Sequence, residues 1–527
     1  MFNEWPRLGP NGMKTSKNAP SSLKKRGALL AGYLFLFSVL GEEVCGQLSA
    51  PVKRPNILLI VADDMNWDSP GCFGGAADEI TPNIDKLASE GIRFFHAYAN
   101  ISICTPSRSV MLTGLYPHNN GAEGFQRIHP GTPTLPSILQ EAGYLCGTVG
   151  KPLSQEELFR WSAAYRWPGA GDENQWGRDP AIYRSFSRQF FSMAKTAHQP
   201  FFLMASSHDP HRPFGKGEAK QAPQERADSS RTFRAEEVKL PGLLPDLPGV
   251  REEFASYCTS VRRLDDMVGA VLEELEEAEL VDETIVLFLS DHGMPFAGAK
   301  FNCYPESVRS PMVIRWPGTV EPGALDERHM VSMIDLMPTL LDAVGLDSPT
   351  TDGRSFLPLL RGENQSRRDA IFAQFHHIHG SDALPMRSVI TREAAYVFNP
   401  WSNGKRRFAR LSGSASSAMK NQAEKDPAIA ARIQHLELRS VEEFFDLSQD
   451  SSCLTNRIAS EDSQKQIEAL RSRLRSWMAK TSDPALSAFD QRDQPEALED
   501  FVESYQATAQ QQKDELRDYE KRKGYRF

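Results

Sequence analysis

Residues 56–61 read NILLIV, a short and continuous apolar run that is rich in branched side chains. A run of this kind predicts a strand that is buried on both faces of a parallel sheet. Further apolar runs at 201–206 (FFLMAS), 284–290 (TIVLFLS) and 312–316 predict three more buried strands. Between them, the apolar residues of 254–275 recur with the spacing of an amphipathic helix. This alternation predicts an α/β fold with a large mixed, mainly parallel sheet flanked by helices.

Changes in composition and hydrophobic pattern divide the chain into four predicted parts. Basic residues precede the apolar run 27–40 and small residues follow it, so 1–46 is predicted to be a signal peptide of an exported, periplasmic or extracellular protein. The α/β domain is predicted over 51–380. Shorter, alternating segments predict a smaller α+β subdomain over 381–490, and dense charge predicts a charged, solvated helical tail over 491–527.

Composition excludes several classes of protein. The net charge of −9 argues against a nucleic-acid-binding protein, which would need a basic surface. The run 27–40 is too short to span a bilayer comfortably, although a membrane anchor is the alternative to a signal peptide, and no later stretch is apolar enough for a stable span. Seven scattered cysteines without a CxxC pair make a zinc site and a full disulfide framework unexpected.

Acidic residues follow two of the predicted strands. Asp63 and Asp64 come directly after the first strand, and Asp291 and His292 follow 284–290. Open α/β sheets place their sites at such strand ends. Adjacent carboxylates repel each other unless a cation lies between them, and hard oxygen ligands suit Ca²⁺ or Mg²⁺. The sequence therefore predicts a metal site here, the alternative for the first pair being a simple loop cap.

The segment Cys104-Thr-Pro-Ser-Arg108 predicts a helix that begins at a cysteine. Pro106 suits a first helical turn, where exposed N–H groups favour an anion. Arg108 lies four residues on, on the same helical face as Cys104. Two histidines, His208 and His211, follow the strand at 201–206. A nucleophile, a guanidinium and the carboxylates are thus expected to converge, although a cysteine before a helix is by itself most often structural.

CTPSR, followed by SVMLTGLYPHNNG, resembles the signature of the type I sulfatases, formylglycine-dependent enzymes of the alkaline phosphatase superfamily. The resemblance covers roughly 54–480. It includes RPNILLIVADD, TPNIDKLASEGIRF, GTVGK, HDPHRPF, SDHG, VRSPMVIRWPG and EEFFDLSQD. HDPHRP and SDHGMPFAGAK are similar to segments of bacterial polysaccharide sulfatases and, more loosely, of heparan N-sulfatases. The resemblance implies an alkaline phosphatase-like fold and a sulfatase catalytic domain.

The resemblance implies that Cys104 acts as an aldehyde. A formylglycine-generating maturation enzyme would oxidise it to 3-oxoalanine, and one hydroxyl of the hydrated aldehyde would attack sulfur in line. The second hydroxyl would then lose its proton, expel sulfate and regenerate the aldehyde. The divalent cation, Ca²⁺ with Mg²⁺ less favoured, would be held by Asp63, Asp64, Cys104, Asp291 and His292.

The remaining catalytic residues are carried over from matching motifs. Arg108 would hold the formylglycine hydrate and the sulfate oxygens, and Lys151 and Lys300 would neutralise sulfate charge. His211 matches the DPH histidine of the family and would protonate or hold the leaving oxygen. His208 has either a supporting or a structural role.

One position departs from the family pattern. Active members usually carry a histidine two or three residues after the lysine of GK, whereas this chain has Leu153 and Ser154. The departure puts the final elimination step in question. His96, His118 and His208 are the candidates to replace the missing group.

The expected function is a sulfuric ester hydrolase that removes sulfate from a sulfated carbohydrate. Sulfamate (N–S) hydrolysis, as in N-sulfoglucosamine sulfamidases, is an alternative that the motifs do not exclude. A phosphohydrolase or phosphonate hydrolase is disfavoured, because the Pro and Ser of CTPSR fit the maturation signal. A degenerate glycan-binding homologue is a further alternative, which only Leu153 and Ser154 support.

Overall fold

A computed structural model describes residues 54–151, 156–165, 177–214, 228–378, 383–408 and 413–523. The predicted signal peptide and the positions Leu153 and Ser154 lie outside the described residues. None of the helices searched within these ranges is both long and apolar enough to cross a membrane. The six cysteines that the structure describes are all free.

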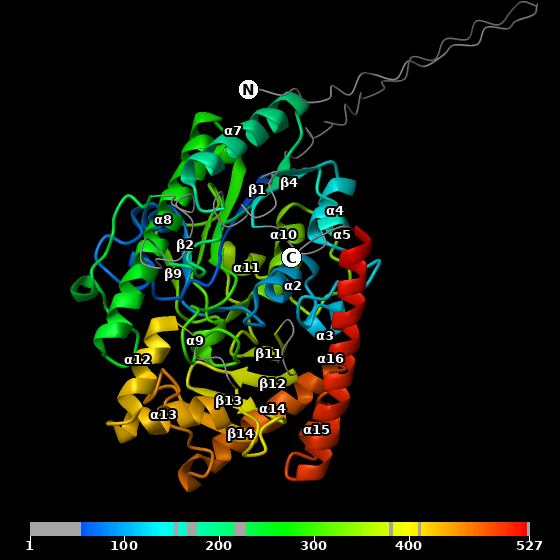
Figure 1. Cartoon of the computed structure of the whole chain (residues 1–527). Helices are drawn as coiled ribbons and strands as arrows, with labels where there is room; N and C mark the ends of the chain where they lie inside the picture. The colour runs from blue at the N-terminus through cyan, green and yellow to red at the C-terminus, as the bar shows by residue number, and fades with distance from the viewer. Residues whose placement is uncertain are drawn as a thin grey trace, which may run out of the picture. The chain divides into compact units, whose positions relative to one another are not determined.

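The centre of the molecule is a large sheet (Figure 1). Eight strands of the described chain form it, in the order β5-β4-β6-β1-β7-β8-β2-β9. The strand β1 pairs in parallel with β6 on one side and with β7 on the other. The strand β8 is antiparallel to both β7 and β2, so the sheet is mixed but mainly parallel, as predicted. The bounds are β1 (Asn56–Ala62), β2 (Ile92–Phe94), β4 (Leu145–Gly150), β5 (Ala163–Tyr165), β6 (Phe201–Ser206), β7 (Thr284–Ser290), β8 (Met312–Arg315) and β9 (Ala324–Asp326).

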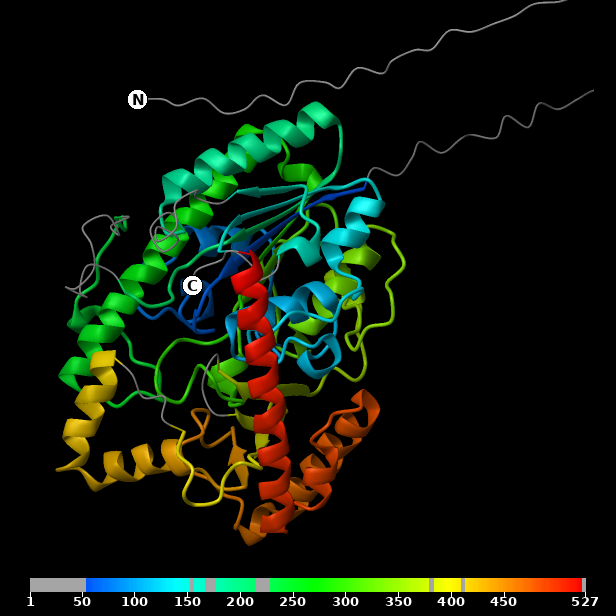
Figure 2. The ribbon, with the colours of Figure 1, turned by 45° about the vertical axis from the view of Figure 1, so that its right-hand side comes forward.

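Helices cover both faces of this sheet because its central strands are apolar on both sides. Side chains of β1 alternate between two cores: Leu58 and Ile60 belong to one, and Ile57 and Leu59 to the other. The first core also takes in α7 and α8, and the second takes in α4 and α10 (Figure 2). The bounds are α1 (Pro82–Ser89), α2 (Cys104–Thr113), α4 (Leu135–Glu141), α7 (Pro180–Ala197), α8 (Pro248–Glu277) and α10 (Leu336–Ala343).

Short elements complete the main part of the chain. The chain near residue 94 forms two short strands, β2 and β3, and the helix predicted over 254–275 extends beyond both ends of that range. The remaining bounds are β3 (Ala97–Tyr98), β10 (Val331–Ser332), α3 (Pro117–Asn120), α5 (Glu156–Phe159), α9 (Pro305–Val308) and α11 (Leu357–Leu360), with 3-10 turns at η1 (Gly71–Phe73), η2 (Ala235–Glu237), η3 (Val281–Glu283), η4 (Met333–Asp335) and η5 (Glu461–Ser463).

Besides a two-stranded sheet of β10 and β3, a second large sheet, which is antiparallel, follows, in which four strands of the described chain have the order β11-β12-β13-β14. Helix α14 carries the buried side chains of Leu470 and Leu474. Residue 380 stays a predicted boundary, and β11 already belongs to this second sheet. The bounds are β11 (Ile371–His377), β12 (Ala383–Ile390), β13 (Ala394–Phe398), β14 (Glu442–Asp446), α12 (Gly413–Ala423), α13 (Pro427–Leu438), α14 (Gln464–Thr481), α15 (Leu486–Asp490) and α16 (Pro495–Lys523).

The helix α16 occupies the predicted charged tail, but it is not simply solvated. It buries Val502 and Tyr505, and it runs from the second sheet toward the main one (Figure 2). Gln512 accepts a hydrogen bond of 2.5 Å from Gln126, in the segment that follows α3. The polar composition of the segment does not reveal this apolar stripe. A small number of buried side chains along one face is enough to pack a helix against the rest of the protein.

A buried ion pair joins β12 to the segment after α14. The guanidinium of Arg387 donates two hydrogen bonds, of 2.6 and 2.9 Å, to Asp483, and both side chains are inaccessible to solvent. We expect Arg387→Met to lower the free energy of unfolding by about 3–5 kcal/mol, because it leaves the Asp483 carboxylate buried without its counter-charge. Chemical denaturation measures this change.

The matched control is Arg475→Met. Arg475 pairs with Asp490 at 2.7 Å, but both side chains are exposed. An exposed pair contributes less than about 1 kcal/mol, so this variant should unfold almost as the wild type does. Equal losses in the two variants would contradict the importance of the buried pair.

Candidate active site

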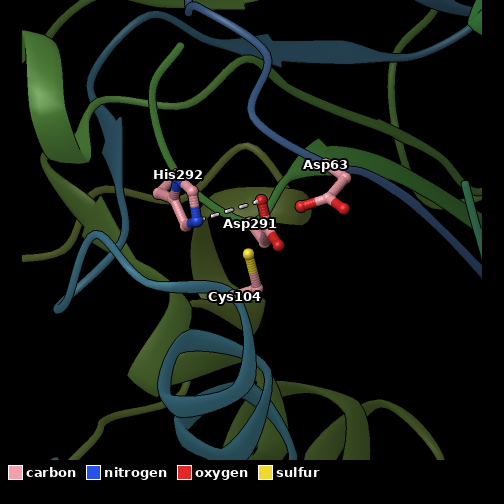
Figure 3. Close-up of side chains that lie close together, drawn as sticks. All are labelled: Asp63, Cys104, Asp291 and His292. Carbon is pink, nitrogen blue, oxygen red and sulfur yellow. Dashed lines mark ion pairs between the residues drawn. The ribbon is translucent and has the colours of Figure 1, made fainter. Parts of the chain in front are cut away.

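The ends of β1 and β7 meet the start of α2 and form one cluster. Ligand atoms of Asp63, Cys104, Asp291 and His292 all lie within 4.8 Å of one another (Figure 3). Asp64 forms a second group of this kind with Cys104 and His211. The sequence-predicted residues of the two strand ends and of the CTPSR segment are therefore brought together.

Backbone contacts fix the turn that carries the two adjacent carboxylates. Asp64 has a φ of 69°, in the left-handed region that non-glycine residues seldom adopt. Its N–H donates to Asp291 Oδ1 at 3.1 Å, and the N–H of Asp63 donates to the carbonyl oxygen of Asp209 at 3.0 Å. These bonds hold the strained turn, so that Asp63 and Asp64 both reach the cluster.

Cys104 is the first residue of α2, and it is buried. Its Sγ lies 3.5 Å from the Nζ of Lys300 and 4.0 Å from Asp64 Oδ1. Burial, followed by the negative charge of Asp63, raises the pKa of the Cys104 thiol to about 12. At neutral pH an unmodified thiol here would be protonated and hence a poor nucleophile.

Three cations neutralise the three carboxylates. Lys300 Nζ donates to both oxygens of Asp64, at 2.7 and 2.8 Å, and Lys151 pairs with Asp63. Arg108 Nε lies 3.1 Å from Asp291 Oδ2. Burial alone would lower the pKa of both lysines, but the neighbouring carboxylates raise it above the usual lysine range, so both ammonium groups stay charged.

The same charges keep the carboxylates ionised. Burial alone would raise the pKa of Asp63, but Lys151, His211, Arg108 and Lys300 hold it well below its usual value. Burial would also raise the pKa of Asp64, but Lys300 and His211 lower it below its usual value. Asp63 and Asp64 are therefore ionised at neutral pH, each paired with a lysine.

Two buried atoms of the cluster fit a divalent cation. Asp63 Oδ1 and His292 Nε2 have no hydrogen-bond partner among the described residues. His292 Nδ1 lies 3.1 Å from the carbonyl oxygen of Gly293, to which a ring N–H donates, so that Nε2 keeps its lone pair. Carboxylate oxygens with one imidazole nitrogen can hold a hard divalent ion, and they do not distinguish Ca²⁺ from Mg²⁺.

Arg108 supplies hydrogen-bond donors that have no partner among the described residues. Only 1% of its side chain is exposed, and within the described part of the chain neither Nη1 nor Nη2 has a hydrogen-bond partner. Nε is used to hold Asp291. Two free guanidinium donors beside Cys104 can bind the oxygens of a tetrahedral anion.

His211 lies beside the carboxylates at the mouth of the cluster. Its Nε2 is 3.7 Å from Asp64 Oδ2, and 38% of its side chain is exposed. Burial lowers the pKa of His211 to about 4, against the opposing charge of Asp64. The histidine is thus neutral in the free protein at neutral pH.

His208 lies at the end of β6, next to the strand end that carries Lys151. The N–H of Lys151 donates to the carbonyl oxygen of Ser206 at 2.8 Å, which joins the two strand ends. His208 is 8% exposed, and its Nε2 has no hydrogen-bond partner in the described ranges. Burial, followed by the charge of Lys151, holds the pKa of His208 well below the usual histidine range. The ring packs against Gly177, where a Cβ would lie only 2.0 Å from it.

The other two histidine candidates make contacts elsewhere. His96 stacks edge-on against Phe95, and burial with the charge of Arg309 lowers its pKa to about 4. His118 lies 3.0 Å from the carbonyl oxygen of Thr481 and 2.6 Å from the side chain of Gln374. Of the three, His208 is the one on which the charges of Lys151 and Asp63 act.

Sequence reasoning missed the ion pairs that support the HDPHRP loop. Asp209 accepts hydrogen bonds of 2.6 and 2.7 Å from Arg263 of α8, and it also pairs with Arg178. The signal was present, since Asp209 stands between the two histidines, but its partners lie far away in the sequence. These pairs fix the loop from which both histidines project.

The family of the chain follows from comparison of its sequence with known families. The family model described as "Sulfatase" matches residues 55–346, and the model described as "N-sulphoglucosamine sulphohydrolase, C-terminal" matches residues 297–398. The chain belongs to the sulfatase family. It is accordingly a sulfuric ester hydrolase, and the predicted resemblance is confirmed.

Individual relatives agree with this assignment. This sulfatase is 30% identical to the human protein named N-sulphoglucosamine sulphohydrolase, over 83% of this chain and 92% of the relative. It is 26% identical to an N-acetylglucosamine-6-O-sulfatase of Bacteroides thetaiotaomicron, over 71% of this chain and 81% of the relative.

A solved structure has the same fold. That protein was determined in complex with its substrate D-glucosamine-2-N,6-O-disulfate, and it aligns with a TM-score of 0.63 at 19% identity. The alignment covers 82% of this sulfatase and 99% of that chain. The alkaline phosphatase-like sulfatase fold is therefore confirmed.

Proposed function

We propose that this sulfatase removes sulfate groups from a sulfated carbohydrate, with Cys104 converted to formylglycine as the nucleophile. One observation carries the proposal. Within the described chain, the buried cluster has two acceptors without a hydrogen-bond partner, Asp63 Oδ1 and His292 Nε2, and Arg108, which binds Asp291 of this cluster, has two donors without one, Nη1 and Nη2. Such a site suits a cation and an oxyanion together.

The residues of the cluster have distinct proposed roles. Asp63, Asp64, Asp291 and His292, with residue 104, would hold a divalent cation, for which we favour Ca²⁺. When bound, such an ion supplies positive charge that favours deprotonation of a nearby hydroxyl group. The hydrated aldehyde at position 104 attacks sulfur in line, so that an S–O bond forms as the bond to the leaving atom breaks.

The basic residues stabilise the charge that moves during this step. Arg108 orients the sulfate oxygens with its two free nitrogens, while Lys151 and Lys300 offset the negative charge of the sulfate. They are already charged and fixed by carboxylates, so they need little reorganisation. After transfer, loss of the proton on the second hydroxyl expels sulfate and restores the aldehyde.

We propose that His211 protonates or holds the leaving atom. It is neutral in the free protein, and the negative charge of a bound sulfate ester would raise its pKa toward the range in which it can donate a proton. Its exposed position suits contact with the sugar side of the substrate.

Active members of the family usually carry a histidine at the positions of Leu153 and Ser154. We propose that His208 takes the place of that histidine. We expect His208→Asn to lower kcat at least about tenfold, because a buried imidazole beside Lys151 is lost while polarity is retained. The pH profile of kcat should change shape as well, which a merely structural role would not cause. The control is His198→Asn, at the left-handed C-cap of α7, where asparagine is well tolerated. An unchanged kcat for His208→Asn would exclude this role.

The relatives narrow the proposed substrate to sulfated amino sugars. The named human relative is an N-sulphoglucosamine sulphohydrolase, and the second family model is the C-terminal part of such proteins. These two observations favour a sulfamate (N–S) substrate as the second candidate beside an O-sulfate ester. The disulfated glucosamine complex of the similar structure is compatible with either.

The deciding experiment is a sulfate-release assay on protein produced together with a formylglycine-generating enzyme. The substrates are N-sulfoglucosamine, glucosamine 6-O-sulfate, an aryl sulfate and an aryl phosphate. Release from a sulfated sugar supports the proposal, and the preferred sugar identifies the N- or O-linked substrate. Faster turnover of the phosphate would favour a phosphohydrolase. Binding without release, after confirmed conversion of Cys104, would favour the glycan-binding alternative.

Export is part of the same proposal. A sulfated polysaccharide is an extracellular material, and residues 1–46 have the pattern of a signal peptide. We propose the same four-part division of the chain as before, with catalysis carried by the α/β domain.

A further inference from the structure

A cavity separate from the catalytic cluster, which we call the basic groove, lies between the loops around η4 and the helix α14. It encloses about 800 Å³. None of the described residues that line it belongs to the catalytic cluster. Its basic lining side chains are Arg354, Arg367, Arg368, Arg473 and Lys480.

The charge of the basic groove is opposite to that of the whole chain. The chain has a net charge of −9, whereas the five basic side chains of the groove face the acidic side chains Asp335 and Asp352. A cavity that concentrates positive charge on an acidic protein attracts anions selectively.

Both acidic side chains are already used by the fold. Asp335 forms a buried pair with Arg368 at 2.5 Å, and it accepts a hydrogen bond of 3.0 Å from the N–H of Ser332. Asp352 accepts hydrogen bonds of 2.9 Å from the N–H of Tyr116 and from the side chain of Asn119. The charge of Asp335 is therefore offset by Arg368, and Asp352 is the one carboxylate of the lining without a cationic partner among the described residues, against four further basic side chains.

Three basic side chains of the groove remain without a carboxylate partner in the part of the chain that the structure describes: Arg354, Arg367 and Lys480. Arg354 Nη2 donates to the carbonyl oxygens of Ser366 and Arg367, at 2.8 and 3.2 Å, which holds its guanidinium beside Arg367. Burial, followed by the positive charge of Arg368, lowers the pKa of Arg354. An anion placed between these groups would relieve the repulsion.

One wall of the groove is aromatic. The rings of Phe372 and Trp477 stack at 5.1 Å with planes 4° apart, and Tyr116 meets Trp477 edge-on at 4.9 Å. Tyr116 and Trp477 are each only 6% exposed, so the half-buried Phe372 is the ring that offers apolar surface to a ligand. Cations beside such a surface suit a sugar that carries anionic groups, because its sulfates or carboxylates meet guanidinium and ammonium groups.

The catalytic cluster lies at the start of α2, and the groove includes a residue that follows its C-terminal end. Cys104 begins α2, and Tyr116 follows the C-terminal end of this helix. Ten helical residues rise about 15 Å, which sets the scale of separation between the two sites. A chain of several sugar units can extend over such a distance.

We propose that the basic groove is a second binding site for an anionic, sulfated oligosaccharide, which holds one part of a glycan chain while another part reacts at Cys104. The inference rests on the proposed function, since it takes the polymer to be the substrate. The same chemistry would also bind free inorganic sulfate, and the test separates the two.

The test measures binding of a heparin oligosaccharide to the full chain in a Cys104→Ala background, so that turnover cannot interfere. We expect Lys480→Glu combined with Arg367→Asn to weaken this binding about tenfold or more, and the remaining binding to depend less on salt. Asparagine is chosen because Arg367 has a φ of 59°, in the left-handed region that asparagine tolerates. Lys465→Glu, at the other end of α14, is the control and should leave the affinity unchanged.

The same groove substitutions in the active protein should leave sulfate release from a monosaccharide within about twofold of the wild type, while kcat/KM on the polymer falls about tenfold. Unchanged oligosaccharide affinity, or equal binding of the fully desulfated oligosaccharide, would overturn the proposal. Displacement of the oligosaccharide from the groove by equimolar inorganic sulfate would identify a simple anion site instead. Failure of the proposed function would appear separately, as no sulfate release from any monosaccharide by the wild type.

Discussion

Replacement of Cys104 with alanine is expected to abolish sulfate release, with kcat lowered by more than about 10⁴-fold. The residue is the only one of the described cysteines that contacts both Lys300 and the Asp64 carboxylate. As a thiol its pKa is about 12, so the chain has little thiolate to offer and depends on the converted aldehyde. Initial rates of sulfate release on a sulfated sugar measure the loss.

The control for this variant is Cys72→Ala, at a half-buried cysteine outside the cluster. It should retain wild-type rates, and thermal unfolding should show that both variants are folded. Peptide mass spectrometry on active wild-type protein provides the chemical check. If the peptide that contains residue 104 carries an unmodified thiol in fully active material, the formylglycine mechanism is wrong.

Removal of the divalent cation is expected to have an effect of similar size. A chelator should reduce sulfate release to the background rate, and added Ca²⁺ should restore it. Asp63→Asn should lower the affinity for Ca²⁺ by more than about 100-fold, because Asp63 Oδ1 is a buried acceptor with no protein partner among the described residues. His292→Gln should lower the affinity less, since it removes a neutral ligand.

Binding of the cation can be measured without activity. Ca²⁺ at a hundred times its dissociation constant should stabilise the wild type by about 2.7 kcal/mol, seen as a higher Tm. Asp63→Asn should lose this shift, whereas Asp347→Asn, at an exposed site, should keep it. Titration calorimetry with Ca²⁺ and Mg²⁺ identifies the preferred ion. A wild type whose Tm and activity are both indifferent to chelation would contradict the metal site.

The part of the site that could be predicted consists of residues that are close together in the sequence. The strand at 56–61 is a continuous apolar run, and Asp63 and Asp64 follow it directly. The strand end and its carboxylates could therefore both be predicted. CTPSR likewise predicted a helix that begins at Cys104, as α2 does. Parallel strands place their carboxyl ends at one edge, which is why two separate acidic segments could be expected to meet.

Other features depended on contacts that no local pattern encodes. The predicted tail proved to be a docked helix, because Tyr505 and Val502 find apolar partners that its charged composition does not suggest. His208 could be named as a candidate, but only the pairing of β4 with β6 places it beside Lys151. The missing histidine therefore has a candidate replacement from a neighbouring strand rather than from its own segment.

The amino-acid sequence by itself determined the α/β class, the strand ends that carry Asp63, Asp64 and Asp291, and the helix that begins at Cys104. These follow from hydrophobic periodicity and from residues adjacent in the chain, and both act over a few positions. Only the tertiary structure decided the pairing of Arg387 with Asp483, the unpaired nitrogens of Arg108 and the basic groove. Burial and charge pairing depend on distances through space between segments far apart in the chain, and those distances exist only once the chain is folded.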